Sequence, residues 1–317
     1  MPEPTANPGI TAVSRVGGSR STLRPGAARG ASARNLRAAN LSLVLRTCLA
    51  GRGRSSRADI ASSTHMTRAT VSRLVDELLD SRILVELSPH EGGSPGRPAT
   101  PVAPRPGSVV AMGIQVNIGY LAARVVDLAG AVLGELDLPG DFRHSEWREV
   151  MARLAELARQ AREEFVPAGS IYLGAALGVP GLVSPSGLAV APNLGWRELD
   201  TDQLFGPLRD VDPVLMQNEA NLAAFAVAHP TPGVSGGPDS FVFISGEVGI
   251  GAGIVFDHQI LAGVHGWSGE IGHICVDPLG VLCTCGAHGC LETFAGQRAV
   301  SRNAGMGDDA QPAQVLA

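Results

Sequence analysis

Hydrophobic side chains in the first third of the chain recur at the spacing of one helix face. A first stripe, at positions i, i+3, i+4, i+7 and i+8, predicts a helix that begins near Leu36 and comprises Leu41, Val44, Leu45, Cys48 and Leu49. A second stripe of the same spacing predicts a helix that Thr67 caps, and comprises Val71, Leu74, Val75, Leu78 and Leu79. Because Cys48 lies within the first stripe, we expect its side chain in a hydrophobic core.

Two shorter elements complete this region. Ser56 and Asp59 have the spacing of a capping box, which predicts the start of a short helix between the two long ones. Beyond the second long helix a β-hairpin is predicted, with its first strand, its glycine- and proline-rich tip and its return strand at residues 83–87, 88–97 and 98–102. Helix, short helix, turn, helix and hairpin is the order of a winged helix-turn-helix, so residues 35–103 are predicted to form a DNA-binding domain.

Proline and glycine mark the boundaries of this domain. Residues 1–34 are rich in Gly, Pro, Ala, Ser and Arg without any periodicity, which predicts a disordered basic tail. Pro101, Pro104 and Pro106 predict a stiff linker at residues 104–108.

From Val109 onward, strand and helix patterns alternate. Three consecutive strands are expected at residues 109–118, 120–128 and 131–136, followed by a long amphipathic helix that starts at Trp147. The later strands are expected at residues 171–177, 213–217, 240–245, 250–256 and 259–261, with a helix at 220–228. Three antiparallel strands followed by alternating helices and strands predict an α/β fold with a ribonuclease-H-like half over residues 109–317.

The composition limits the class of protein. A chain of 317 residues with 44% hydrophobic and 17% charged residues has the make-up of a globular protein of two or three domains. No apolar run reaches the about 18–20 residues that cross a bilayer, and no signal peptide is evident, so no membrane partner is expected. Four of the five cysteines lie between Cys275 and Cys290, which favours a metal site in the reducing cytoplasm over a disulfide framework.

The net charge of −5 conceals an asymmetry between the two ends of the chain. Residues 1–105 carry 15 arginines against seven acidic residues, whereas residues 106–317 carry ten against 23. A basic head on an acidic body is typical of a protein whose head contacts a polyanion such as double-stranded operator DNA. The alternative is a basic tail without a partner, and charge alone does not separate the two.

The second long helix carries the expected DNA-reading residues. In a helix-turn-helix, the N-terminal residues of this helix enter the major groove, and here they are Arg68, Thr70, Ser72 and Arg73. Arg97, in the predicted hairpin tip, is placed to enter a narrow minor groove. The alternative is that these are solvated charges on an ordinary helical bundle.

A cluster of metal-ligating residue types lies near the C-terminal end. His273, Cys283, Cys285 and Cys290 have the spacing H-x9-C-x-C-x4-C, and one histidine with three cysteines is a usual ligand set of structural Zn²⁺. Four protein ligands leave no position for a reactive water, which disfavours a zinc hydrolase. Cys275 is a further possible ligand because it should share the face of His273 along an extended segment, and weaker candidates are His265 and His288. The alternative is a set of independent buried cysteines.

Four motifs around this cluster resemble the ROK family (repressors, open reading frames and sugar kinases). They are the glycine-rich stretch 246–253, Gly-Glu-Ile-Gly-His at 269–273, Cys-Thr-Cys-Gly at 283–286 and Gly-Cys-Leu-Glu at 289–292. The resemblance extends from about Leu36 to Ala299 and is to the family's xylose- and N-acetylglucosamine-type repressors. Repressors of this family continue well past the zinc region, so the resemblance implies that a chain ending at Ala317 has an incomplete second lobe.

The resemblance implies a two-lobed, actin-like sugar-kinase fold that binds a sugar or sugar phosphate in its cleft and assembles as a homodimer or larger homo-oligomer. The residues that match the family's sugar-binding positions are Asn193, Asn218, Glu219, Glu270, His273 and Glu292. Amides and carboxylates suit this task because they pair with sugar hydroxyls as both donors and acceptors. His273 is expected to serve the metal and the sugar.

Three departures from the family's kinases favour a repressor. The first phosphate loop, Asp-x-Gly-Gly-Thr in the kinases, reads Gln-Val-Asn-Ile-Gly at residues 115–119. Glu247 and Val248 stand where the second loop has Gly and Thr, and Glu219 replaces the aspartate base. We therefore expect no ATP binding, no catalytic residue and no enzyme activity: a sugar-responsive repressor of carbohydrate genes. The alternative is an ATP-dependent sugar kinase or a bifunctional protein.

Overall fold

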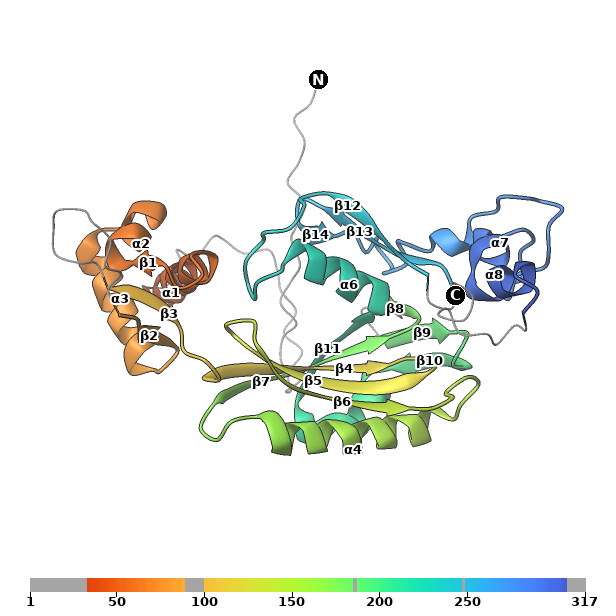
Figure 1. Ribbon diagram of the computed structural model, residues 1–317, viewed down its shortest axis with the longest axis horizontal. Coiled ribbons are helices and arrows are strands. Elements are labelled where there is room, and N and C mark those ends of the chain that lie inside the picture. Colours follow the sequence, from red (N-terminus) through yellow and green to blue (C-terminus); the bar gives the residue numbers. More distant parts are fainter. Residues whose placement is uncertain (1–32, 89–99, 185–186, 247–248, 307–317) are drawn as a thin grey trace, which may run out of the picture.

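The computed structural model describes residues 33–88, 100–184, 187–246 and 249–306. A small N-terminal unit of three helices and three short strands stands beside a larger α/β unit (Figure 1). Several sequence-based expectations lie outside the described residues: the tail up to residue 32, the hairpin tip with Arg97, and the loop positions Glu247 and Val248.

Two of the three N-terminal helices begin where the capping signals predicted, and the first begins three residues before its expected start near Leu36. The helices are α1 (Ala33–Ala50), α2 (Arg57–Thr64) and α3 (Arg68–Asp80). At the start of α2 the Asp59 amide donates to Ser56 Oγ, and the Ser56 amide donates to Asp59 Oδ2 at 2.9 Å, which completes the predicted capping box. At the start of α3, the Thr70 amide donates to Thr67 Oγ1 at 3.2 Å. Local side-chain chemistry therefore sets both helix starts.

A small antiparallel sheet completes this unit. Its strands, in the spatial order β1-β3-β2, are β1 (Ser55–Ser56), β2 (Leu84–Glu86) and β3 (Pro101–Pro104). The hairpin strands were predicted, whereas β1 was not. Pro104 pairs with Leu84 inside the sheet, so the expectation that it begins a linker is wrong. Cys48 is fully buried in the core between the helices and the sheet, as its place in the hydrophobic stripe predicted.

The larger unit is built on a five-stranded sheet with the order β11-β7-β4-β5-β6. Its strands are β4 (Val109–Val116), β5 (Tyr120–Asp127), β6 (Val132–Pro139), β7 (Ile171–Val179) and β11 (Pro213–Asn218). β4, β5 and β6 form an antiparallel meander, while β7 and β11 run parallel to β4. The parallel strands β4, β7 and β11 therefore end at the same edge of the sheet.

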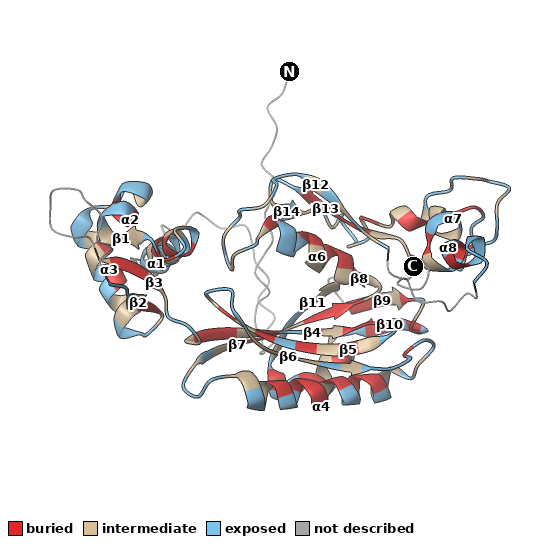
Figure 2. Cartoon of the chain, viewed as in Figure 1, coloured by how far each residue is buried: buried red, intermediate tan, exposed pale blue. Residues whose placement is uncertain are grey.

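One long helix, α4 (Trp147–Phe165), covers one face of this sheet (Figure 1). Its sheet-facing side is buried and its outer side is exposed, as the predicted stripe requires (Figure 2). The buried residues of the stripe are Val150, Met151, Leu154, Leu157, Ala158 and Ala161, all part of the largest hydrophobic core.

A second small sheet borders the same edge and was not predicted. Its strands are β8 (Leu182–Ser184), β9 (Gly187–Ala191) and β10 (Trp196–Asp200), followed by the short helix α5 (Thr201–Phe205) and a 3-10 helix (Gly206–Val211). These strands have three to five residues and pair in the order β10-β9-β8. The connection between β9 and β10 carries Asn193.

The face of the large sheet opposite α4 is covered by the helix that follows β11 (Figure 1). Helix α6 (Glu219–Ala228) packs against a hairpin sheet of β12 (Phe241–Ser245), β13 (Gly251–Phe256) and β14 (Gln259–Ile260). A 3-10 turn, η2 (Ile271–His273), and two short helices, α7 (Leu291–Ala295) and α8 (Gln297–Asn303), follow. Among the described residues, no helix combines the length and the apolar character that crossing a membrane requires.

Candidate metal centre and ligand cavity

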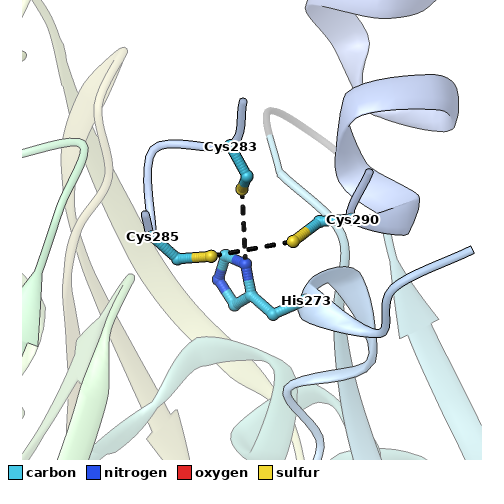
Figure 3. A group of neighbouring side chains, drawn as sticks. All are labelled: His273, Cys283, Cys285 and Cys290. Carbon is cyan, nitrogen blue, oxygen red and sulfur yellow. Dashed lines mark hydrogen bonds between the residues drawn. The ribbon is translucent and has the colours of Figure 1, made fainter. Parts of the chain in front are cut away.

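The four predicted metal ligands come together in one cluster. One ligand atom of each of His273, Cys283, Cys285 and Cys290 lies within 4.8 Å of the others, and their side chains point toward a common centre (Figure 3). Cys283 Sγ lies 3.7 Å from His273 Nδ1, and Cys285 Sγ lies 3.6 Å from Cys290 Sγ. The cluster is therefore a candidate metal centre.

Short turns hold these ligands in place. His273 ends the turn η2, and Cys290 precedes the first residue of α7. Between them, the Cys283 amide donates to Ala287 O at 2.8 Å, which closes the turn that carries Cys285. Gly289 has a φ of +63°, and a Cβ there would lie 1.6 Å from Asp277 O, so only glycine fits immediately before Cys290.

The spacing of the four ligands fits tetrahedral Zn²⁺. With Zn–S near 2.3 Å and Zn–N near 2.0 Å, the edges of a tetrahedron are about 3.8 Å between sulfurs and about 3.6 Å between sulfur and nitrogen. The observed 3.6 Å and 3.7 Å match these edges. Burial and the neighbouring Cys285 thiol raise the pKa of Cys290 to about 12, and a cation at the centre would favour the thiolate form that coordination needs.

The other candidate ligands lie outside the cluster. Cys275 is exposed and is not one of the four clustered residues. Ile274, between His273 and Cys275, has the extended backbone that was expected, and Cys275 forms an isolated antiparallel bridge with Cys290, but its thiol is not among the clustered ligand atoms. His288 Nδ1 instead contacts Gly280 O at 3.1 Å, and His265 packs against Trp267.

A cavity of about 360 Å³ adjoins this metal centre at the edge where β4, β7 and β11 end. All six residues expected to bind a sugar line it: Asn193, Asn218, Glu219, Glu270, His273 and Glu292. The large sheet, the β9–β10 connection, the N-terminus of α6 and the metal-binding segment each contribute part of the wall. Sequence reasoning missed Arg197 and Ser245, which also line the cavity and lie outside the recognised motifs.

Two of the six residues are already engaged where β11 meets α6. Asn218 caps α6: its Oδ1 accepts from the Ala220 and Asn221 amides, and its Nδ2 donates to Gly181 O at 2.9 Å. A helix cap is thus a second role for Asn218, which holds its amide rigidly at the cavity wall.

The neighbouring carboxylate of Glu219 is held by two side-chain amides at the end of β4. Glu219 Oε2 accepts from Gln115 Nε2 at 3.1 Å and lies 3.4 Å from Asn117 Nδ2. Amide donors on the carboxylate oxygen fix its position and occupy lone pairs that a general base would use. This arrangement suits a fixed binding group better than a proton acceptor.

His273 connects the metal centre with the cavity. Its Nδ1 faces the thiols, while its Nε2 lies 3.9 Å from Glu270 Oε2 in the cavity wall. Burial raises the pKa of Glu270, an effect that His273 opposes and Glu292 increases. Glu292 Oε2 accepts from the Ile250 amide at 3.3 Å, beside Gly249, where a Cβ would lie 2.3 Å from that oxygen.

The expected DNA-reading residues lie along α3, away from this cavity. Arg68 and Arg73 are exposed, whereas Thr70 and Ser72 are half-buried. Two of the three acidic residues of the same helix are paired elsewhere, Asp76 with Arg57 at 2.8 Å and Glu77 with Arg37 at 2.7 Å. Neither Arg68 nor Arg73 forms an ion pair within the described part of the chain, so both cations face solvent.

Comparisons with known proteins agree with this geometry. Residues 111–316 match the ROK family. A xylose repressor from Caldicellulosiruptor bescii is 30% identical over 275 residues, 84% of this chain and 65% of the repressor. A glucokinase from Halalkalibacterium halodurans is 30% identical over 205 residues, 62% of this chain and 59% of the kinase.

Among solved structures, a ROK family transcriptional regulator described as a homolog of the E. coli MLC protein is similar with a TM-score of 0.65 and 27% identity. The similarity covers 85% of this chain and 67% of the regulator. The chain spans 63–65% of the length of the xylose repressors that it matches. The match over residues 111–316, the shared α/β sugar-kinase-type fold and the clustered histidine and cysteines show together that the chain belongs to the ROK family.

Proposed function

We propose that this protein is a sugar-responsive transcriptional repressor that binds operator DNA, contains a structural Zn²⁺ and does not act as a kinase. One observation carries the proposal. The similarity to the xylose repressor covers 84% of the chain and must include residues before 111, whereas the similarity to the glucokinase covers 62%. The similarity to the xylose repressor therefore extends into the N-terminal unit.

The N-terminal unit has the parts that DNA reading requires. Helices α2 and α3 follow each other across a short turn, and the strands β2 and β3 flank the segment that would form the wing. Arg68, Thr70, Ser72 and Arg73 would contact the major groove, and Arg97 the minor groove. Arg68 and Arg73 are exposed and form no ion pair with the described residues, so contacts to phosphate or guanine would break no such pair.

The cavity has the chemistry of a sugar site. Its walls carry the side-chain amides of Asn193 and Asn218 and the carboxylates of Glu219, Glu270 and Glu292, which can pair with the hydroxyls of a monosaccharide. Zn²⁺ held by His273 and the three cysteines would brace the segment that carries Glu270 and Glu292. When bound, this ion supplies structural cross-linking, and His273 Nε2 remains directed at the cavity.

The same site argues against phosphoryl transfer. Family kinases use the first phosphate loop and an aspartate base, but here Gln115 and Asn117 donate to, or lie beside, the Glu219 carboxylate. Misplacement of a reacting group by roughly 1 Å can cost about a hundredfold in rate. Because a glucokinase is among the relatives, a sugar kinase or a bifunctional protein is the second candidate function.

Control of operator binding by a sugar requires a structural connection between the cavity and the N-terminal unit. Helix α6 begins at the cavity with Glu219, and beyond its far end a Cβ at Gly233 would lie 3.8 Å from Leu49 of α1. We propose that the sugar favours one arrangement of the two units in a homodimer and so changes operator affinity. A hundredfold change in affinity corresponds to a coupling free energy of about 2.7 kcal/mol.

The test uses the purified, zinc-loaded chain and duplexes selected by it from a random-sequence library. Binding to the selected duplex is measured by fluorescence anisotropy with and without a panel of monosaccharides, and ATP turnover is measured in parallel. We expect tight, sequence-specific binding, a change in affinity with at least one sugar, and no sugar-dependent ATP hydrolysis. Turnover at ordinary enzyme rates of about 1–10³ s⁻¹ would favour the kinase instead.

A further inference from the structure

Cys275, which is not one of the clustered ligands, lies directly opposite the ligand Cys290 on a neighbouring segment. The two residues form an isolated antiparallel bridge. Backbone hydrogen bonds flank this pair on both sides, from the Leu291 amide to Ile274 O at 2.9 Å and from the Val276 amide to Gly289 O at 2.8 Å. Cys275 and Cys290 are therefore a non-hydrogen-bonded pair, the kind of antiparallel pair whose Cα atoms come closest, at about 4.5 Å.

This pairing suits a disulfide bond. Disulfides join cysteines whose Cα atoms are usually about 4.4–6.8 Å apart. Opposite residues of an antiparallel pair also project their side chains to the same face of the ladder. The sulfur atoms of Cys275 and Cys290 can therefore meet through rotation of the side chains, while the backbone keeps its pairing.

The two thiols differ in their access to solvent. Cys275 is exposed, whereas Cys290 is fully buried and points toward the other three ligands (Figure 3). Because Cys275 lies outside the ligand cluster, its sulfur stays available when a metal is bound. An exposed cysteine beside a second cysteine that can resolve its first oxidation product is the usual arrangement of a redox-sensing thiol.

We propose that Cys275 is a peroxide-sensitive oxidation site, and that its disulfide with Cys290 dismantles the metal centre. The Cys275 thiol attacks one oxygen of hydrogen peroxide, the O–O bond breaks, and a sulfenic acid and one water form. The Cys290 thiolate then leaves the metal and attacks the sulfenic sulfur. The S–S bond forms, the S–O bond breaks, and the departing hydroxide takes a proton from solvent to become the second water. The two sulfurs lose two electrons in total, and the peroxide gains them.

Oxidation in this way would weaken metal binding. Without Cys290, the ligand set is reduced to His273, Cys283 and Cys285, so the affinity for Zn²⁺ falls. The segment that carries Glu270 and Glu292 then loses its cross-link, which connects an oxidant in solution with the wall of the larger cavity. This inference rests on the structural Zn²⁺ of the proposed function, and it does not depend on which sugar or operator the protein binds.

Oxidation of the purified, zinc-loaded chain by a small excess of hydrogen peroxide tests the proposal. Zinc release is followed with a chromogenic chelator, and disulfides are mapped by mass spectrometry of a non-reduced digest. We expect stoichiometric release together with a Cys275–Cys290 disulfide, and recovery of bound zinc after treatment with dithiothreitol and Zn²⁺. Cys275→Ser should hold zinc in the reduced state and release it at least tenfold more slowly under peroxide.

Cys48→Ala is the matched control, since Cys48 is buried in the N-terminal core and should not affect zinc release. Zinc content and thermal midpoint are measured for each variant before oxidation. Equal release from Cys275→Ser and the unsubstituted chain would overturn the proposal and leave the proposed function intact. A disulfide between Cys285 and Cys290, whose sulfurs lie 3.6 Å apart, would do the same. If the reduced chain holds no zinc, the structural Zn²⁺ of the proposed function fails as well.

Discussion

Removal of the metal should loosen one segment and leave the large sheet intact. In residues 261–295, none of the described side chains belongs to the three hydrophobic clusters, and the regular structure there is limited to η2 and α7. We therefore expect the folded conformation of this segment to depend on cross-links through a bound metal ion rather than on a hydrophobic core. The large sheet has its own core against α4 and should not respond.

The size of the effect follows from mass action. If free Zn²⁺ stands a thousandfold above its Kd, binding stabilises the segment by about 4.1 kcal/mol. Losing this amount should speed exchange of the amide hydrogens that depend on the segment by about a thousandfold. The reporters are the Val276, Cys283 and Gly289 amides, which donate at 2.8 Å to Gly289 O, Ala287 O and Val281 O.

Hydrogen exchange with mass spectrometry, before and after chelation, measures this change. Cys290→Ser should behave like the chelated protein and bind less than one equivalent of zinc. Cys275→Ser, its matched control, should retain zinc and protection, because Cys275 is exposed and outside the ligand cluster. Unchanged exchange at the three reporter amides after complete chelation would refute the argument, as would stoichiometric zinc in Cys290→Ser.

Three further predictions concern the N-terminal unit. Arg73→Ala should weaken binding to a selected duplex by about 1–3 kcal/mol if Arg73 reads a base; unchanged anisotropy titrations would place the recognition face elsewhere. Ser56→Ala should cost about 1 kcal/mol in the stability of this unit, measured by urea unfolding, because it removes a helix cap. Burial raises the pKa of Cys48 to about 11, so at pH 8 its thiol should stay protonated and unreactive toward a thiol reagent while exposed Cys275 reacts; fast labelling at Cys48 would contradict this.

The helix starts could be predicted because their signals are local. The capping residues of α2 and α3 act within three residues of each helix start, and the hydrophobic stripe behind each start extends over several turns. Elements that depend on pairing with residues far along the chain were not predicted. Strand β1 has only two residues and exists because they pair with Pro101 and Val102, which lie far along the chain.

The residue types in the sequence predicted which four side chains form the candidate metal centre. Three cysteines and one histidine at this spacing have few other uses, and the structure brings them together. The expected extended backbone after His273 is present at Ile274, yet Cys275 is exposed and lies outside the cluster. Arg197 and Ser245 were missed, because their relevance depends on a cavity that only the folded chain creates.

Two of the three departures from the kinase pattern are far apart along the chain but meet at one point in the fold. Gln115 and Asn117 lie about a hundred residues before Glu219 in the sequence, yet both of their side-chain amides face its Oε2. A carboxylate that already accepts from an amide is stabilised in its ionised form and fixed in direction. Restoring an aspartate at position 219 would shorten this side chain and leave the facing amides without their acceptor. Gln115, Asn117 and Glu219 therefore form one hydrogen-bonded group beside the cavity.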